Sequence, residues 1–205
     1  AAKLTLDATT NSIHYNKDYQ ESLDVSGQVS GPKFSAEFKD TDTKQLVVTD
    51  VINSTSISLT PEFGLADPKV DKNRVIYPIN GLNAQAVYTL RAGSVKEDIV
   101  LNKYQKDEVS FAYKLELPAG TEARQESDGS ISVYGVDSKL LGNVSTATEA
   151  DQALLQKARD NGKKTQLLFS IPRPISVQAD KQKRNTKTWY TLENNLLTVH
   201  ASNLK

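Results

Sequence analysis

Large side chains alternate with smaller or polar ones along several short stretches of this sequence. The longest run has Val109, Phe111, Tyr113, Leu115 and Leu117 at every second position. A period of two places such side chains on one face of a β-strand. Shorter runs of the same kind lie at 23–27, 34–38, 57–59, 131–133 and 196–199, and their Val, Thr, Ser and Tyr content suits a half-buried pleated surface.

Turn-forming residues separate these runs. Asp128-Gly129 precedes the run that begins at Ile131, and Ala92-Gly93-Ser94 lies between the apolar stretches 87–90 and 95–101. Both arrangements are typical of β-hairpins. The spacing of strand and turn signals predicts about fourteen to sixteen short strands. We therefore expect an all-β fold, a large β-sandwich whose sheets form two layers or subdomains.

The stretch Pro61–Lys72 is the candidate domain boundary, because it is polar, contains two prolines and has no clear period. It separates an N-terminal β layer or subdomain, residues 1–60, from a main β-sandwich, residues 73–205. One continuous domain is the alternative, since all-β chains of about 200 residues also fold as single units.

One segment has helical periodicity. Its apolar stripe comprises Ala147, Ala150, Leu154, Leu155 and Ala158, and Asn161-Gly162 supplies a stop signal. Thr146 with Glu149 forms a capping-box pattern, and Thr148 with Asp151 forms a competing one. We predict one inserted α-helix near 147–161. Because so short a helix is marginal alone, Leu154 and Leu155 are expected to pack on a sheet; the alternative is a docking face for another domain.

Composition and charge exclude several classes of protein. The 205 residues include 25 Lys and Arg and 25 Asp and Glu, so the formal net charge is zero. Coating nucleic acid or an anionic membrane needs a basic excess, so neither partner is expected. Absence of Cys rules out disulfides, thiolate zinc sites and a cysteine nucleophile. No apolar run approaches the roughly 20 residues that span a bilayer, so no membrane insertion is expected. The opening Ala1-Ala2, without Met, is typical of a processed or cut terminus.

No catalytic constellation is visible in the sequence. His14 and His200 lie at opposite ends of the chain, and no Gly-x-Ser-x-Gly elbow occurs. Glu97 and Asp98 are adjacent, so on a strand their carboxylates point to opposite faces and cannot flank one glycosidic bond. We expect no enzyme and no cofactor.

The acidic stretches 39–43 and 67–71 are candidate calcium loops, but neither has the EF-hand pattern. We interpret both as solvated loops. An intramolecular Lys–Asn isopeptide crosslink, similar to that of some Gram-positive adhesin domains, stays open, because it depends on three side chains that the linear sequence does not place together.

Three aromatic residues are candidate ligand contacts: Trp189, Tyr190 and Tyr88. Exposed rings of this type would stack on sugars. The basic stretch Lys181–Arg184 precedes Trp189, and a basic and aromatic combination also binds nucleic acid or an acidic glycan. The preferred interpretation is a polar hairpin loop followed by a strand whose Trp lies in the core.

A series of short motifs runs from residue 75 to residue 180. They are Val75-Ile-Tyr77-Pro, residues 82–88 and 93–101, Phe111-Ala-Tyr-Lys-Leu115, Asp128-Gly129-Ser-Ile131, and Phe169-Ser-Ile-Pro-Arg-Pro174 followed by Asp180. This order of motifs resembles the β-rich N-terminal module of Rhs/YD-repeat-type bacterial cell-surface or secreted proteins. The predicted helix departs from that pattern as an insertion before Phe169.

The resemblance implies a non-catalytic structural or interaction module, with a role such as adhesion, in a larger bacterial protein. It implies an extracytoplasmic location, at the cell surface or secreted. Its partners would be the other domains of the parent protein and a glycan or protein ligand. The alternative function is a carbohydrate-binding or carbohydrate-active β-sandwich domain.

Overall fold

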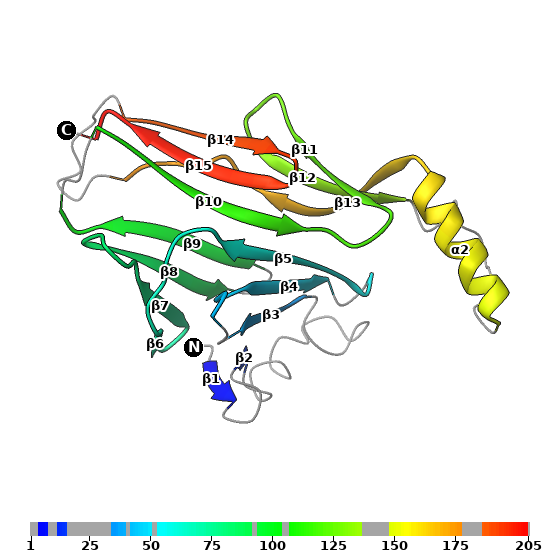
Figure 1. Ribbon diagram of the computed structural model, residues 1–205, viewed down its shortest axis with the longest axis horizontal. Helices are drawn as coiled ribbons and strands as arrows, with labels where there is room; N and C mark the ends of the chain where they lie inside the picture. Colours follow the sequence, from blue (N-terminus) through cyan, green and yellow to red (C-terminus); the bar gives the residue numbers. More distant parts are fainter. Residues whose placement is uncertain are drawn as a thin grey trace.

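The chain is described by a computed structural model covering residues 4–7, 12–15, 34–39, 42–50, 53–91, 94–103, 107–136, 148–177 and 186–204. Within these ranges it forms fifteen strands and one α-helix (Figure 1). The elements are β1 (Leu4–Asp7), β2 (Ser12–Tyr15), β3 (Phe34–Lys39), β4 (Leu46–Asp50), β5 (Thr55–Pro61), β6 (Lys69–Asp71), β7 (Arg74–Pro78), β8 (Ala84–Arg91), β9 (Ser94–Leu101), β10 (Glu108–Glu116), β11 (Thr121–Gln125), β12 (Ile131–Val136), α2 (Glu149–Asn161), β13 (Lys164–Ile171), β14 (Lys187–Glu193) and β15 (Leu196–Ser202).

The strands form three antiparallel sheets. The largest has eight strands in the order β1-β2-β3-β4-β5-β10-β15-β14, and the smaller two are β6-β7-β8-β9 and β11-β12-β13. The expectation of an all-β sandwich with one inserted helix is confirmed. Strand β10 shows why the alternation predicted it: Val109, Phe111, Tyr113 and Leu115 are buried, and the residues between them are exposed or half-buried.

Both smaller sheets pack on the same face of the eight-stranded sheet. Phe38 and Leu46 of the large sheet share a core cluster with Tyr77 of the four-stranded sheet. Leu115 of the large sheet packs with Val133 of the three-stranded sheet. The sandwich therefore has one eight-stranded layer and a second layer made of two sheets. Among the described residues, no sheet packs on the opposite face of the large sheet.

Strands from both sides of the Pro61–Lys72 stretch share one sheet and one core. Strand β5 ends within this stretch at Pro61 and pairs directly with β10, with Leu59 opposite Leu115. Core residues before and after the stretch lie in the same clusters, as Phe38 and Tyr77 do.

The hairpins follow the turn signals. Strands β11 and β12 pair around Asp128-Gly129, where Gly129 has φ of +85°. The pairing of β8 with β9 extends to Arg91 opposite Ser94, on either side of the predicted turn. A further turn at Asn194-Asn195 joins β14 to β15, and both residues have positive φ, as a type I′ turn requires.

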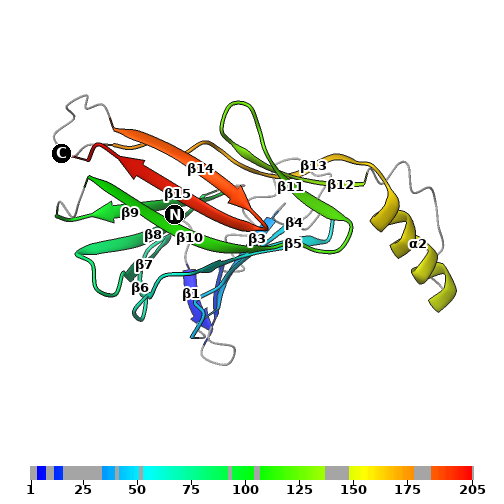
Figure 2. The same cartoon turned by 45° about the horizontal axis from the view of Figure 1, so that its top comes forward.

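Helix α2 extends away from the sandwich, between β12 and β13 in the chain (Figures 1 and 2). None of its residues is buried. Leu154 is 62% exposed, so the expectation that it packs on a sheet is wrong, whereas Leu155 is half-buried. The N-cap is Thr148, whose hydroxyl accepts a hydrogen bond of 3.1 Å from the Asp151 amide. The competing capping pattern is thus the one used, and Thr146 lies outside the described residues.

Candidate ligand-binding face

The face of the eight-stranded sheet that points away from both smaller sheets is called the outer face here. Strand β10 identifies it, because Phe111 and Tyr113 point into the core and the residues between them point outward. Strand pairing extends the assignment to the neighbouring strands. The outward positions on β4, β5, β10, β15 and the edge strand β14 include Val47, Ser56, Ser58, Thr60, Ser110, Ala112, Lys114, Glu116, Trp189, Thr191, Thr198 and His200.

At one end of this face, two rings stack across neighbouring strands. Trp189 of β14 lies directly opposite His200 of β15, with the ring centroids 5.0 Å apart and the planes 8° from parallel. The His200 Nδ1 atom is 2.9 Å from the Ser110 hydroxyl, and its Nε2 atom is 2.9 Å from the Thr191 hydroxyl. Because both ring nitrogens have partners, the imidazole is held in one orientation and supports one face of the indole.

The Trp189 side chain is open to solvent. It is 36% exposed, so the expectation of a core Trp is wrong. Strand β14 is the last strand of its sheet, and within the described chain no further strand pairs with it. The Gln125 amide of β11 donates to its Tyr190 carbonyl at 2.7 Å, and its Thr188 hydroxyl donates to the Pro174 carbonyl at 2.7 Å. The indole therefore stacks on His200 with one face. No described strand pairs beyond β14 to place a second ring against the other face.

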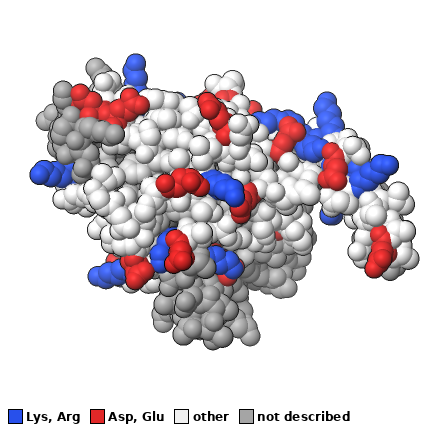
Figure 3. All heavy atoms as spheres, viewed as in Figure 1, with Lys and Arg blue, Asp and Glu red and all other residues white. Residues whose placement is uncertain are grey.

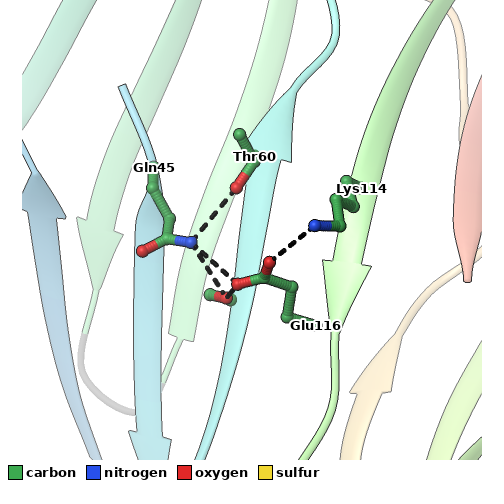
Figure 4. A network of polar contacts seen from close by, with 5 residues as sticks. Gln45, Thr60, Lys114 and Glu116 are labelled. Carbon is green, nitrogen blue, oxygen red and sulfur yellow. Dashed lines mark hydrogen bonds and ion pairs between the residues drawn. The ribbon is translucent and has the colours of Figure 1, made fainter. Parts of the chain in front are cut away.

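At the other end of the outer face, polar side chains form a network around Glu116. Its carboxylate accepts hydrogen bonds from the Gln45 amide at 3.1 Å and the Ser58 hydroxyl at 2.9 Å, and it forms an ion pair with Lys114 at 2.9 Å. The Gln45 amide also donates to the Thr60 hydroxyl at 3.1 Å. Figure 4 shows these side chains converging from β5, β10 and the residue that precedes β4. The network fixes a set of donors and acceptors in place.

An open hollow of about 240 Å³ lies beside this network. Its lining combines polar groups of Gln45, Ser58 and Glu116 with the apolar Val47 and Pro118. A concave surface with a few fixed polar groups is the usual form of a small-ligand contact. The hollow is shallow, which suits part of a larger ligand better than complete enclosure of a small one.

The outer face carries few charges. Its central ion pair, Lys114 with Glu116, has no net charge. The hydrogen bond from Lys114 is the main cause that lowers the pKa of Glu116, and the same contact raises the pKa of Lys114. Figure 3 looks onto this side of the molecule and shows a wide uncharged surface with a short row of acidic and basic groups near its centre. Such a surface offers no field that would select a polyanion.

Between the layers, a carboxylate meets tyrosine hydroxyls. The Tyr113 hydroxyl donates a hydrogen bond of 2.7 Å to Glu97. Burial raises the pKa of Glu97, against the lowering effect of hydrogen bonds from Tyr88 and Tyr113. Burial and the Glu97 charge raise the pKa values of Tyr88 and Tyr113 well above their ordinary range, and that of Tyr190 to about 12. These shifts disfavour a phenolate, so none of the three tyrosines is prepared to act as a nucleophile.

The three ligand contacts predicted from sequence are not brought together on one surface. Trp189 is on the outer face, and Tyr190, the next residue on the strand, points to the opposite side, level with Val199. Tyr88 is 5% exposed and packs against Phe38 at 5.3 Å between ring centroids, so it belongs to the core. The residues missed by sequence reasoning are His200, Ser110 and Thr191. These residues meet Trp189 only through the pairing register of β10, β15 and β14, and a local stretch of sequence does not show that register.

The remaining candidates for chemistry stay dispersed. Glu97 points to Tyr113, and Asp98 instead forms an ion pair with Lys96 at 2.6 Å, as expected for neighbours on a strand. In the candidate calcium stretch at 67–71, Asp67 pairs with Lys44 at 3.0 Å. Among the described residues, no group of three acidic or His side chains could hold a metal ion. The basic stretch Lys181–Arg184 lies outside the described residues.

In the part of the chain that the structure describes, no helix has the length and apolar character needed to cross a membrane. Comparison of the chain with protein-family models, with curated proteins and with solved structures gives no match.

Proposed function

We propose that this chain is a non-catalytic interaction module of a larger bacterial cell-surface or secreted protein, and that the outer face is its binding surface. The observation that carries the proposal is the pair of fixed side-chain groups on this otherwise weakly charged face: the Trp189–His200 stack and the Glu116 network. Sheet faces without a function need only solvated polar side chains. Here the polar groups are tied to one another and present an exposed ring.

The contacts of the most plausible catalytic groups support a binding role over a catalytic one. His200 is flanked by two hydroxyls, and neither ring nitrogen contacts a carboxylate that would orient it as a general base. Glu97 accepts hydrogen bonds from tyrosine hydroxyls whose pKa values are raised. Its neighbour Asp98 points away and pairs with Lys96. A retaining or inverting glycosidase needs two carboxyl groups facing one bond, and this pair does not provide them.

Helix α2 supports membership in a larger protein. It carries Leu154 at 62% exposure on an element with no buried residue. An exposed apolar position on a projecting helix is a suitable contact for a neighbouring domain. The extracytoplasmic location rests on the resemblance of residues 75–180 to the surface-protein module.

The proposal is tested in the organism that encodes the chain. An antibody raised against the isolated module is used to blot envelope, secreted and cytosolic fractions, with a cytosolic enzyme as the fractionation marker. We expect a band well above 22.5 kDa, the mass of this chain, in the envelope or secreted fraction. A free cytosolic polypeptide of the chain's own mass would contradict the proposal.

A further inference from the structure

The geometry of the outer face points to a neutral polysaccharide as its ligand, with the Trp189 indole as the stacking platform and the Glu116 network as a second contact. This inference rests on the proposed function, because it names the ligand class for the same face. It begins with the indole, which is 36% exposed and supported on one side by His200 at 5.0 Å. A sugar ring presents C–H groups on its faces and hydroxyls around its edge, which matches an aromatic plane surrounded by hydroxyls.

The platform is built before any ligand arrives. Hydroxyls of Ser110 and Thr191 hold His200, and His200 holds the indole in a nearly parallel stack. Fixing side chains in the free protein reduces the conformational entropy that binding would otherwise cost. The hydroxyl groups near the ring can also exchange hydrogen bonds with sugar hydroxyls at its edge.

The charges of the face favour a neutral ligand. The charged outward positions on β10, β14 and β15 are Lys114, Lys187, Glu108, Glu116 and Glu193. Acidic groups thus outnumber basic ones, and Lys114 is already paired with Glu116 at 2.9 Å. A nucleic acid or an acidic glycan needs a cationic surface, so both are disfavoured here. A neutral glycan needs only hydroxyl, amide and carboxylate partners, which the network supplies.

The separation of the two contacts favours a polymer over a single sugar. Trp189, His200 and Ser110 lie side by side across three strands. Glu116 lies six residues further along β10 than Ser110, a distance of about 20 Å at the rise of a β-strand. Only an extended chain of several sugars can contact the indole and the Glu116 network together. The shallow hollow beside Glu116 suits such a chain, because it is open to solvent and does not enclose a ligand.

The test is affinity electrophoresis of the module in gels that contain a soluble neutral polysaccharide: a β-1,4-glucan, a β-1,3-glucan, a xylan or an α-glucan. Heparin and alginate serve as polyanionic comparisons. We expect at least one neutral polysaccharide to retard the wild type, and Trp189→Ala to weaken that retardation roughly tenfold or more, as for a central aromatic contact. Trp189→Phe keeps a ring and should keep part of the retardation. Val100→Ala, a change at an exposed apolar residue of the four-stranded sheet, is the matched control and should bind as the wild type does.

A second measurement needs no variant. Trp189 is the only Trp of the chain, so its emission reports the platform directly. Saturating amounts of the retarding polysaccharide should shift this emission toward shorter wavelength. The inference is overturned if no neutral polysaccharide retards the protein, if only polyanions do, if folded Trp189→Ala binds as the wild type does, or if the emission is unchanged at saturation. Those results would leave the cell-fractionation test of the proposed function unaffected, so the two failures are distinguishable.

Discussion

The hydroxyl of Tyr113 donates a hydrogen bond of 2.7 Å to the carboxylate of Glu97, and this bond joins the two layers of the sandwich. Tyr113 belongs to β10 of the eight-stranded sheet, and Glu97 belongs to β9 of the four-stranded sheet. Desolvation of the Glu97 carboxylate beside the tyrosine hydroxyls raises its pKa. A layered protein with an ionisable group at the junction should have a stability that depends on pH.

We expect Glu97 to make the protein less stable as pH rises above about 4.5, the ordinary pKa of a Glu side chain. The native state holds the Glu97 proton more tightly than the unfolded chain does, so raising the pH through this range favours unfolding. Glu97→Gln removes the titration and can still accept from Tyr113. It should be more stable than the wild type at neutral pH, as measured by urea unfolding between about pH 4 and about pH 8.

Two comparisons sharpen this prediction. Tyr113→Phe removes a hydrogen bond that lowers the pKa of Glu97, so it should steepen the pH dependence. Asp98→Asn changes the neighbouring carboxylate that pairs with Lys96, and it should leave most of the slope in place. The Glu97 residue is exposed overall, and only its carboxylate end is desolvated beside the Tyr88 and Tyr113 hydroxyls, so solvent still screens its charge and the effect is modest. A Glu97→Gln variant with the same slope as the wild type would contradict the assignment.

Leu115 and Leu154 should respond differently to truncation. Leu115 is 1% exposed and packs with Ile57 and Val133, which joins the large sheet to the three-stranded sheet. Leu115→Ala should lower the free energy of unfolding by about 2–5 kcal/mol, because it leaves a cavity in the core. Leu154→Ala removes a side chain that is 62% exposed, so it should change the free energy of unfolding by no more than about 0.5 kcal/mol. Urea unfolding of both variants provides the measurement; a large loss in Leu154→Ala would show that the helix packs on the sandwich after all.

The N-cap of helix α2 should affect the stability of the helix and leave that of the sandwich unchanged. The Thr148 hydroxyl accepts from the Asp151 amide, so Thr148→Ala should destabilise the helix by about 0.5–2 kcal/mol. Since no residue of α2 is buried, the unfolding midpoint of the sandwich should hardly move. Hydrogen exchange at the amides of 151–161 is the direct measurement. Thr146→Ala is the matched control and should leave this exchange unchanged, whereas faster exchange in it would assign the cap to Thr146.

Replacement of Gly120 by Ala should be destabilising, because Gly120 lies against the last turn of α2. Its φ is +78°, and an added Cβ would lie 2.9 Å from the Cβ atom of Arg159. Gly129 also has a positive φ of +85°, but its nearest neighbour atom would be 4.0 Å away. Both Ala variants incur the left-handed backbone cost of about 1–2 kcal/mol, and only Gly120→Ala adds a close contact. Gly120→Ala should therefore be the less stable variant in urea unfolding and should speed hydrogen exchange near Arg159. Equal stability of the two variants would mean that the helix end moves away freely.

Local patterns alone determined much of the fold. Alternation in β10 placed Val109, Phe111, Tyr113 and Leu115 on the buried face, and the structure has them there. Asp128-Gly129 marked a hairpin because a tight turn needs a residue that accepts positive φ. The helix was also predicted, because helical spacing and a capping Thr are properties of a few consecutive residues. All of these depend on neighbours in the sequence.

Tertiary structure decided which faces meet, and the candidate site follows from that. An alternating strand shows that one face is apolar, but it does not identify the sheet that covers it. The sequence therefore placed Trp189 in the core and Leu154 against a sheet, whereas both are exposed. His200, Ser110 and Thr191 gather beside Trp189 only because β10, β15 and β14 pair in one register, across a separation of up to 90 residues. Register between distant strands is set by the packing of the whole sheet, so no local stretch of sequence contains it.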